Sequence, residues 1–405
     1  MNILMLSSTF PYPPSRGGTE VRTFNLLKYL QQNHQVTLVT QRSREISDDD
    51  VEQLRQYVSE LAIFPLPSSP PPGNWLDKAT RFSQAIGKAT PPNVLHRYAP
   101  EIQAWVDQRV NDGKFEVITC EHSVNEIYVR PEFCHSVRTV VNVHSSLYGW
   151  VSNHLAMGAS SHPWRDRLYL NLLLSRYEKR YCGKFSQIVV TTTDDLHQLQ
   201  QFSPKTPIAV IPNGVDLELF PYRSQDPGGQ ELIFVGAMNA EHNIEAARFF
   251  ALEVLPSLRQ IYPQTTLTIA GAYPTPEVIE LGEFPGVIIT GRVDSMVDYL
   301  HQATVCVVPL RTGYGIKNKT LEAMAAGVPV VASDRGLEGL EVDGSHTPLR
   351  AMRANQVKEY VAVISRLFTE PRLRAQLSSN GRQLIEQDYT WESAGSRYEK
   401  VLLDY

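Results

Sequence analysis

The chain is poor in cysteine, has no long apolar run and carries no excess of positive charge. Four cysteines occur among 405 residues, at Cys120, Cys134, Cys182 and Cys306. They are scattered and show neither metal-ligand spacing nor a dense disulfide framework, so a reducing compartment is the simpler interpretation. No apolar run reaches the roughly 18 residues that a membrane-spanning helix needs. No apolar signal region precedes the first strand, expected at residues 2–6. We therefore expect a cytoplasmic protein.

The charge balance argues against nucleic acid as a partner. The formal net charge is −5 and the isoelectric point is near 6.1, whereas nucleic-acid-binding domains usually carry a basic surface. Any anion-binding site must therefore be locally basic. A length of 405 residues favours two domains, and 42% hydrophobic with 20% charged residues is typical of a globular protein.

Short β-branched apolar runs alternate with helical periodicity along the chain, which predicts parallel α/β domains. Strands are expected at 2–6, 35–39, 117–120, 139–143 and 188–191, and then at 232–235, 267–270, 287–289, 305–308 and 329–332. The predicted fold class is α/β, with two Rossmann-like, doubly wound parallel-sheet domains. The expected bounds are 1–211 and 230–380, with a Pro-, Gly- and Asp-rich linker at 212–229 and a helical segment at 381–405. Ligands of paired domains of this kind bind in the crevice between them, at the carboxyl ends of the strands.

The stretch that reads GYGIKNKTLEAMAAGVPVVASD, residues 313–334, carries the strongest chemical signal. Its glycines allow close backbone approach, and a helix that opens near residues 316–319 would present unpaired N–H groups to a phosphate. Lys319 and Glu322 fall on one helical face, away from the apolar stripe. Spacing alone leaves two interpretations: a site for a phosphorylated, hydroxyl-rich ligand, or a solvated Lys and Glu on an ordinary helix.

Four motifs together resemble family 4 glycosyltransferases of the GT-B fold. They are LEAMAAGVPVVAS from Leu321, IPNGVD from Ile211, FVGAMNAEHNIEAARFF from Phe234, and the pair Gly17 and Gly18 before a helix. They occur in the family's order over nearly the full length. The resemblance implies a retaining transferase that moves a sugar from a nucleotide diphosphate sugar to a glycan or lipid-linked acceptor, with no metal ion and no cofactor. It also implies that the second domain holds the nucleotide and that the first supplies the acceptor site.

The resemblance assigns roles within the phosphate loop. Glu322 would accept hydrogen bonds from the ribose hydroxyls, and Lys319, aided by Lys317, would neutralise the diphosphate. Gly315 and Ile316 would offer backbone amides to the phosphates or the donor sugar. The sequence is closest in pattern to a subgroup from polysaccharide and exopolysaccharide assembly.

Further donor contacts are implied outside that loop. Gly17 and Gly18, at the first strand-to-helix turn, would approach the diphosphate from the opposite domain on closure. Arg292 and Val293 match positions that contact the nucleotide base.

His144, at the end of an expected strand, matches a histidine that the family places near the reacting sugar. With Lys319 and Glu322 it completes the predicted catalytic set. A hydrogen-bonded structural histidine is the alternative, and it stays open. His122 is a second candidate at a comparable strand end.

Three positions depart from the family pattern. Tyr314 stands where many members have an acidic residue that holds the donor sugar, and Ala237 and His242 replace an arginine and a lysine aimed at the diphosphate. We hypothesise that Lys317 and Lys319 jointly replace the two missing charges.

Two helical segments carry further expectations. Residues 164–184 combine arginines and lysines with Trp, Tyr and Leu, and can be either a core helix or a basic amphipathic helix that touches the inner face of a membrane. The segment 381–405 matches the terminal helix that GT-B members pack back onto the first domain.

Other function classes make different demands. A sugar-nucleotide epimerase would share the nucleotide half, and a catalytically weak sugar-nucleotide-binding protein would explain the departures from the family pattern. A nicotinamide dehydrogenase is disfavoured, because SSTFPYPPSRGG replaces a GxGxxG turn after the first strand.

Overall fold

The computed structural model describes residues 1–14, 17–67, 75–156, 158, 160, 162–313 and 315–404, and the side chains of 75–79 and 81 are not described. The prediction about Tyr314 therefore lies outside the described residues. The chain forms two compact units. Met1–Pro212 and Ala394–Tyr405 make the first, and Asn213–Ser393 make the second.

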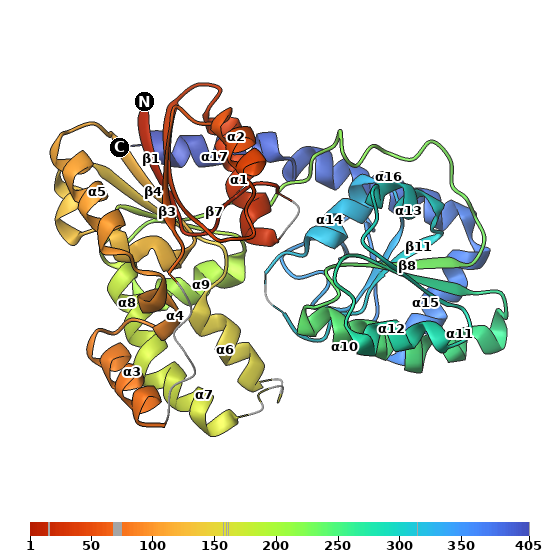
Figure 1. Ribbon diagram of the computed structural model, residues 1–405. Coiled ribbons are helices and arrows are strands. Elements are labelled where there is room, and N and C mark those ends of the chain that lie inside the picture. Colours follow the sequence, from red (N-terminus) through yellow and green to blue (C-terminus); the bar gives the residue numbers. More distant parts are fainter. Residues whose placement is uncertain are drawn as a thin grey trace. The chain divides into compact units, whose positions relative to one another are not determined.

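The first unit is built on a seven-stranded parallel sheet in the order β3-β2-β1-β4-β5-β6-β7 (Figure 1). The strands are β1 Asn2–Ser7, β2 Gln35–Arg42, β3 Glu60–Pro65, β4 Val117–Glu121, β5 Arg138–Val143, β6 Gln187–Val190 and β7 Ile208–Val210. The α-helices are α1 Gly18–Leu30, α2 Asp48–Arg55, α3 Trp75–Gly87, α4 Pro92–Arg97, α5 Pro100–Asn111, α6 Leu147–Ala156, α7 Pro163–Tyr169, α8 Ser175–Cys182 and α9 Thr193–Phe202. The central strands are apolar and buried, as expected for parallel strands covered on both faces.

The register of β4 and β5 aligns Glu121 with Asn142. Side chains alternate between the two faces of a strand, so Thr119, Glu121, Asn142 and the position two residues beyond Asn142 belong to one face. That position is His144. A polar row therefore lies at the carboxyl ends of two buried strands.

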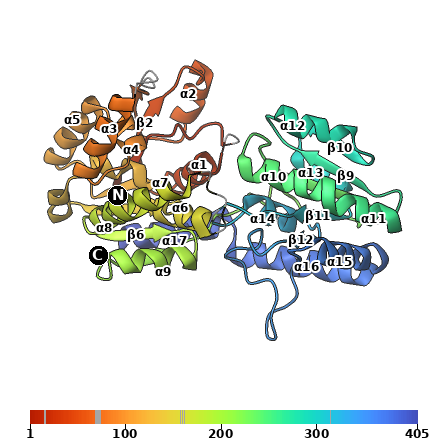
Figure 2. The ribbon, with the colours of Figure 1, turned by 90° about the horizontal axis from the view of Figure 1, so that it is seen from below.

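The second unit has a six-stranded parallel sheet in the order β10-β9-β8-β11-β12-β13. The strands are β8 Glu231–Val235, β9 Thr266–Ala270, β10 Val287–Gly291, β11 Val305–Val308, β12 Val330–Ala332 and β13 Met352–Arg353. The α-helices are α10 Glu241–Phe249, α11 Leu255–Ile261, α12 Pro276–Ile279, α13 Met296–Gln302, α14 Asn318–Ala325, α15 Val357–Thr369 and α16 Pro371–Asp388. In Figure 1, α10, α11, α12 and α15 lie along one face of this sheet, and α13, α14 and α16 along the other. Figure 2 shows α15 beside α16. These two parallel sheets with covering helices confirm the predicted fold class.

The segment 212–229 contains no helix or strand but packs against the second unit. Val215 forms a parallel bridge with Thr390. The Arg223 guanidinium donates to the Ala303 carbonyl at 2.9 Å. From Asn213 onward the segment belongs to that compact unit.

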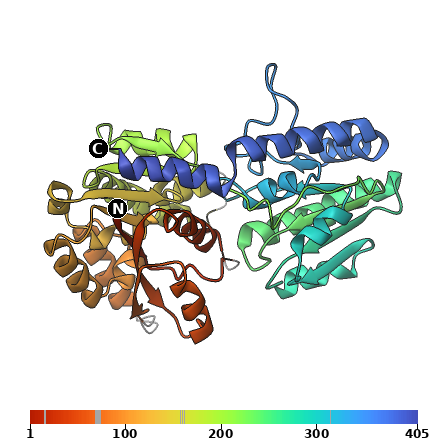
Figure 3. The ribbon, with the colours of Figure 1, turned by 90° about the horizontal axis from the view of Figure 1, so that it is seen from above.

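The helical segment at 381–405 consists of the end of α16 and a separate helix, α17 Trp391–Leu403. The first unit resumes at Ala394, so all but the first turn of α17 belongs to it (Figure 3). Gly395 allows the Tyr29 ring of α1 to approach, since a Cβ there would lie 2.2 Å from the ring Cγ. His34 Nε2 and Glu399 Oε1 lie 2.7 Å apart.

The segment 164–184 folds into α7, a π-helical turn at Leu170–Leu174 and α8. Leu173 and Leu174 are buried. Two of its cations bind the buried Glu126: Arg180 at 2.6 Å, and Lys184. These contacts are the ones expected of a core helix. Across the described part of the chain, no helix has both the length and the apolar character to span a membrane.

Candidate functional site

In the second unit, the loop after β11 leads into the amino-terminus of α14. The backbone at Gly313 and Gly315 has φ values of +99° and +78°, a region that glycine adopts without strain. Lys317 occupies the position before the helix and provides no side-chain cap. The first N–H groups of an uncapped helix end, together with the positive end of the helix dipole, favour an anion.

Lys319 lies in the first turn of α14 with its ammonium held inside the unit. Its Nζ donates to Oδ1 of Asn243 and lies 4.8 Å from the centre of the Phe234 ring. Asn243 is oriented in turn, because its Nδ2 donates to the Ala237 carbonyl at 2.8 Å. Burial lowers the pKa of Lys319 to about 7, so its charge depends on pH in the neutral range.

Gly236 creates the space that Lys319 occupies. A Cβ at this position would lie 2.8 Å from the Lys319 Nζ and 2.8 Å from the Asn243 Nδ2. Such distances are too short for a real side chain, so any larger residue would displace the amine. The glycine after β8, matched to the family by sequence, therefore has a direct packing role.

Glu322 lies one turn further along α14 and is partly exposed. Burial raises the pKa of its carboxyl to about 7, and the nearby Lys319 opposes that rise. Within the described residues, its carboxylate has no hydrogen bond or ion pair. A carboxylate without an internal partner can accept hydrogen bonds from ligand hydroxyls.

Lys317 is arranged differently from Lys319. Its buried ammonium lies 3.0 Å from Oε2 of Glu338 and also donates to the carbonyl of Gly315. Arg335 binds the other Glu338 oxygen at 2.8 Å. The positive charge of Lys317 is thus already balanced by a carboxylate, and its contact with Gly315 holds the glycine loop.

The remaining predicted donor contacts lie at three places. Ile316 is buried in the apolar core, so only its backbone is available. Arg292 is exposed and, with Val293, follows the edge strand β10. In the first unit, Gly17 precedes α1, and a Cβ on Gly18 would meet no atom within 4 Å. At Gly17, by contrast, a Cβ would lie 2.8 Å from Oε2 of Glu20, so the Glu20 carboxylate lies against the start of α1.

The first unit carries the predicted histidines. His144 follows β5, its side chain is buried, and neither ring nitrogen has a hydrogen-bond partner among the described residues. The His122 ring lies 5.3 Å away, and the backbone of His122 has φ +77°, unusual for a residue other than glycine. Burial lowers the pKa of both imidazoles, that of His122 to about 3, so both are neutral near pH 7.

Sequence reasoning missed Glu121, the fully buried residue that faces His144. Its Oε2 lies 3.6 Å from the His144 Nε2, beyond hydrogen-bond length, and accepts from the Asn142 Nδ2 at 2.8 Å. Arg22 of α1 donates to the Asn142 Oδ1 at 3.1 Å. Burial pushes the pKa of Glu121 upward. The facing imidazole, a tyrosine hydroxyl and Arg22 outweigh burial and hold that pKa below its usual value. The sequence signal that could have identified Glu121 is its position as the acidic residue at the end of the apolar run VITCE.

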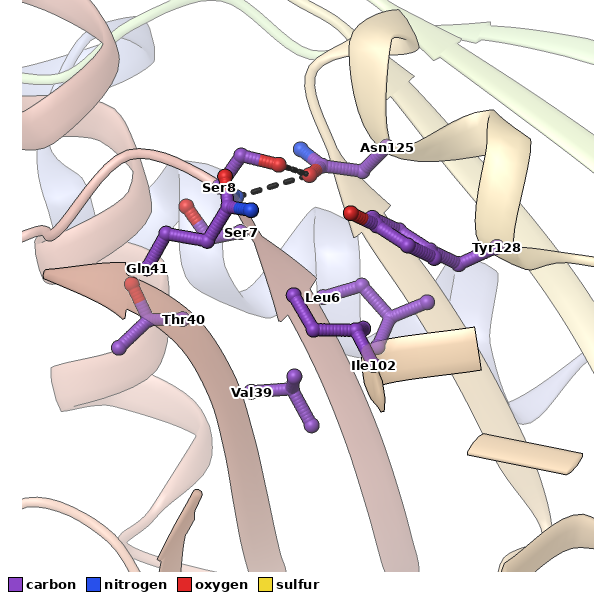
Figure 4. Close-up of a pocket in the computed structure, with 9 residues that line it drawn as sticks. All are labelled: Leu6, Ser7, Ser8, Val39, Thr40, Gln41, Ile102, Asn125 and Tyr128. Carbon is purple, nitrogen blue, oxygen red and sulfur yellow. Dashed lines mark hydrogen bonds between the residues drawn. The ribbon is translucent and has the colours of Figure 1, made fainter. Parts of the chain in front are cut away.

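A small pocket lies at the ends of β1 and β2, on the side of the sheet that carries Leu6 and Val39 (Figure 4). Ser8 donates its backbone N–H to Oδ1 of Asn125 at 2.8 Å. Thr40 Oγ1 and Gln41 Oε1 are buried there without partners among the described residues. The hollow has a volume of only about 10 Å³, close to the least that a single water molecule needs.

In the part of the chain that the structure describes, no group of three or more His, Cys, Asp or Glu side chains could hold a metal ion.

Comparison with known families decides the class of protein. Residues 16–219 match the model "Glycosyltransferase Family 4", and residues 229–370 match "Glycosyl transferases group 1". The chain belongs to glycosyltransferase family 4. The matches cover both units of this family 4 protein, including His144 in the first and the loop with Lys319 and Glu322 in the second.

Curated relatives align with part of the chain. Glycogen synthase of Mycobacterium tuberculosis is 29% identical over 206 residues, 48% of this chain and 48% of that protein. The family 4 chain thus spans about half the length of the curated relatives it matches.

Solved structures share the fold over the whole chain. Sucrose-phosphate synthase from Thermosynechococcus elongatus superposes with a TM-score of 0.71 at 19% identity, covering 99% of this chain and 98% of that one. Anabaena HepE, solved with UDP and glucose, gives a TM-score of 0.65 at 14% identity, covering 100% and 99%. These glycosyltransferases identify the fold of the family 4 protein as GT-B.

Proposed function

We propose that this protein transfers a sugar from a nucleotide diphosphate sugar to a hydroxyl group of a glycan or lipid-linked acceptor. The observation that carries the proposal is the arrangement on α14. The internally held ammonium of Lys319, the carboxylate of Glu322, which has no partner among the described residues, and the uncapped helix end lie within two turns. These groups suit a phosphate and a pair of ribose hydroxyls.

The chemistry assigns a role to each group. The bond between the anomeric carbon and the diphosphate oxygen breaks, and the acceptor oxygen bonds to that carbon. The hydroxyl proton leaves with the diphosphate. Lys319 and the first amides of α14 stabilise the negative charge that grows on the departing diphosphate. Glu322 holds the ribose, and Lys317 holds the loop through Gly315 rather than contacting the phosphates.

The first unit contributes His144 on the acceptor side. A neutral imidazole whose two nitrogens have no hydrogen-bond partner among the described residues can bind a sugar hydroxyl as donor or acceptor. Family 4 membership further supports retention of the anomeric configuration and a reaction without a metal ion. The anomer of the product, determined by NMR, tests retention, and activity after treatment with a chelator tests the second point.

A screen of nucleotide sugars by thermal unfolding tests the proposal. A donor that binds the folded state raises the melting temperature with concentration. Lys319→Met and Glu322→Gln should each reduce that rise. Lys358→Met, at an exposed lysine on α15, is the matched control and should preserve it. No stabilisation by UDP-, ADP- or GDP-sugars would overturn the proposal.

A transfer assay with the selected donor, run beside the thermal screen, separates the alternatives. Glycogen synthase and sucrose-phosphate synthase, two of the similar proteins, are named as synthases, and this does not favour the epimerase. A binding protein without catalysis would show donor stabilisation that depends on Glu322 but no transfer to any acceptor.

A further inference from the structure

The terminal helix α17 supplies a buried hydroxyl to the polar row below His144. Tyr398 is fully buried. Its hydroxyl donates to Oε1 of Glu121 at 2.7 Å and also lies in hydrogen-bond contact with Thr119 Oγ1. Tyr398 and Glu121 are 277 positions apart in the chain. A helix that forms the end of the chain therefore reaches a carboxylate in the centre of the first sheet.

Both oxygens of Glu121 are constrained. Tyr398 and Thr119 hold Oε1, while Asn142 holds Oε2. Oε2 is the oxygen that faces the His144 Nε2 at 3.6 Å. The bond from Tyr398 thus fixes the rotation of the carboxylate and keeps it from closing on the imidazole.

We propose that Tyr398 is a positioning residue for His144, acting through Glu121. Docking of α17 then sets the basicity and orientation of the histidine, in addition to tying the terminal segment to the first unit. Any effect of Tyr398 on catalysis rests on the proposed function, in which His144 binds a reacting hydroxyl. The positioning of His144 by Tyr398 does not depend on that function.

The surroundings of His144 determine the direction of the effect. Burial lowers the pKa of His144 most, Glu121 from β4 raises it, and Arg22 from α1 lowers it further. His122 lies beside the ring, and Asp195 of α9 interacts with Arg22. Loss of the Tyr398 hydroxyl leaves Glu121 with fewer donors and free to approach His144. Both changes stabilise the imidazolium, so the pKa of His144 should rise.

The experiment is an NMR titration of the full chain labelled with ¹⁵N-histidine. Tyr398→Phe removes one oxygen and retains the ring, and we expect it to raise the pKa of His144 by roughly half a pH unit or more. Glu121→Gln should lower it. Tyr29→Phe is the matched control, because the Tyr29 hydroxyl contacts Glu399 of the same helix at 3.4 Å and does not contact Glu121. It should leave His144 unchanged.

The outcomes separate the two proposals. An unchanged pKa of His144 in Tyr398→Phe, or an equal rise in Tyr29→Phe, would overturn the positioning role. A raised pKa with an altered pH profile of kcat supports it and the part of His144 in the reaction. A raised pKa with unchanged kcat and KM supports positioning and refutes the catalytic assignment of His144, leaving the donor site on α14 unaffected.

Discussion

Affinity for a nucleotide sugar should pass through a maximum near pH 7, because two groups on α14 have opposite requirements. Lys319 must be protonated to bind the diphosphate, and its pKa is about 7 in the free protein. Glu322 must be ionised to accept ribose hydroxyls, and its pKa is also about 7. Rising pH removes the ammonium, and falling pH protonates the carboxylate. The decline in affinity above pH 7, the alkaline limb, therefore comes from Lys319. The decline below pH 7, the acid limb, comes from Glu322.

The magnitude follows from the two protonation equilibria. If binding requires both charged forms, the competent fraction falls about eightfold between pH 7 and either pH 5.5 or pH 8.5. Binding near pH 8.5 should also take up close to one proton per donor molecule, because the diphosphate restores the charge of Lys319. The diphosphate of a nucleotide sugar does not titrate in this range.

Isothermal titration calorimetry with UDP-glucose, or with the donor selected by thermal screening, measures both quantities. Lys319→Met should bind more weakly and lose the alkaline limb, while Glu322→Gln should bind more weakly and lose the acid limb. Lys358→Met should retain both. A Kd that stays constant from pH 7 to 8.5, or an alkaline limb that persists in Lys319→Met, would refute the reasoning.

Gly236→Ala should weaken donor binding at least tenfold, because the added methyl group displaces the ammonium of Lys319. Gly87→Ala is the control: its methyl group would meet no atom within 4 Å, and donor binding should not change. Calorimetry measures both affinities. Glu126→Gln should lower the free energy of unfolding by about 3 kcal/mol, because it leaves two cations without their buried partner; urea unfolding tests this, and unchanged stability contradicts it. Lys317→Met and Glu338→Gln should each weaken donor binding by a similar factor. The double variant should bind no more weakly than either single variant, because the two residues act as one pair. A loss confined to Lys317→Met would instead indicate direct phosphate contact.

The candidate donor site was predictable where its parts are neighbours in the chain. Gly315, Lys319 and Glu322 lie in one loop and the helix that follows it, and helical geometry alone places the last two on one face. The alternating apolar runs likewise predicted two parallel sheets, because strands buried on both faces need continuous hydrophobic sequence. The family motifs followed from the same local segments.

The tertiary structure decided which charges are available and which are already paired. Lys317 and Lys319 look equivalent in sequence. Lys317 is neutralised by Glu338, 21 positions away, whereas Lys319 is held by Asn243, 76 positions away. Tyr398 reaches Glu121 through the docking of a whole helix. Such pairings depend on strand register and on packing between distant elements, which local propensity does not encode. The sequence by itself therefore determined the fold class and placed Lys319 and Glu322 on one face of a helix that follows a glycine loop. Only the folded chain determined how those groups are held and which histidine faces a buried carboxylate.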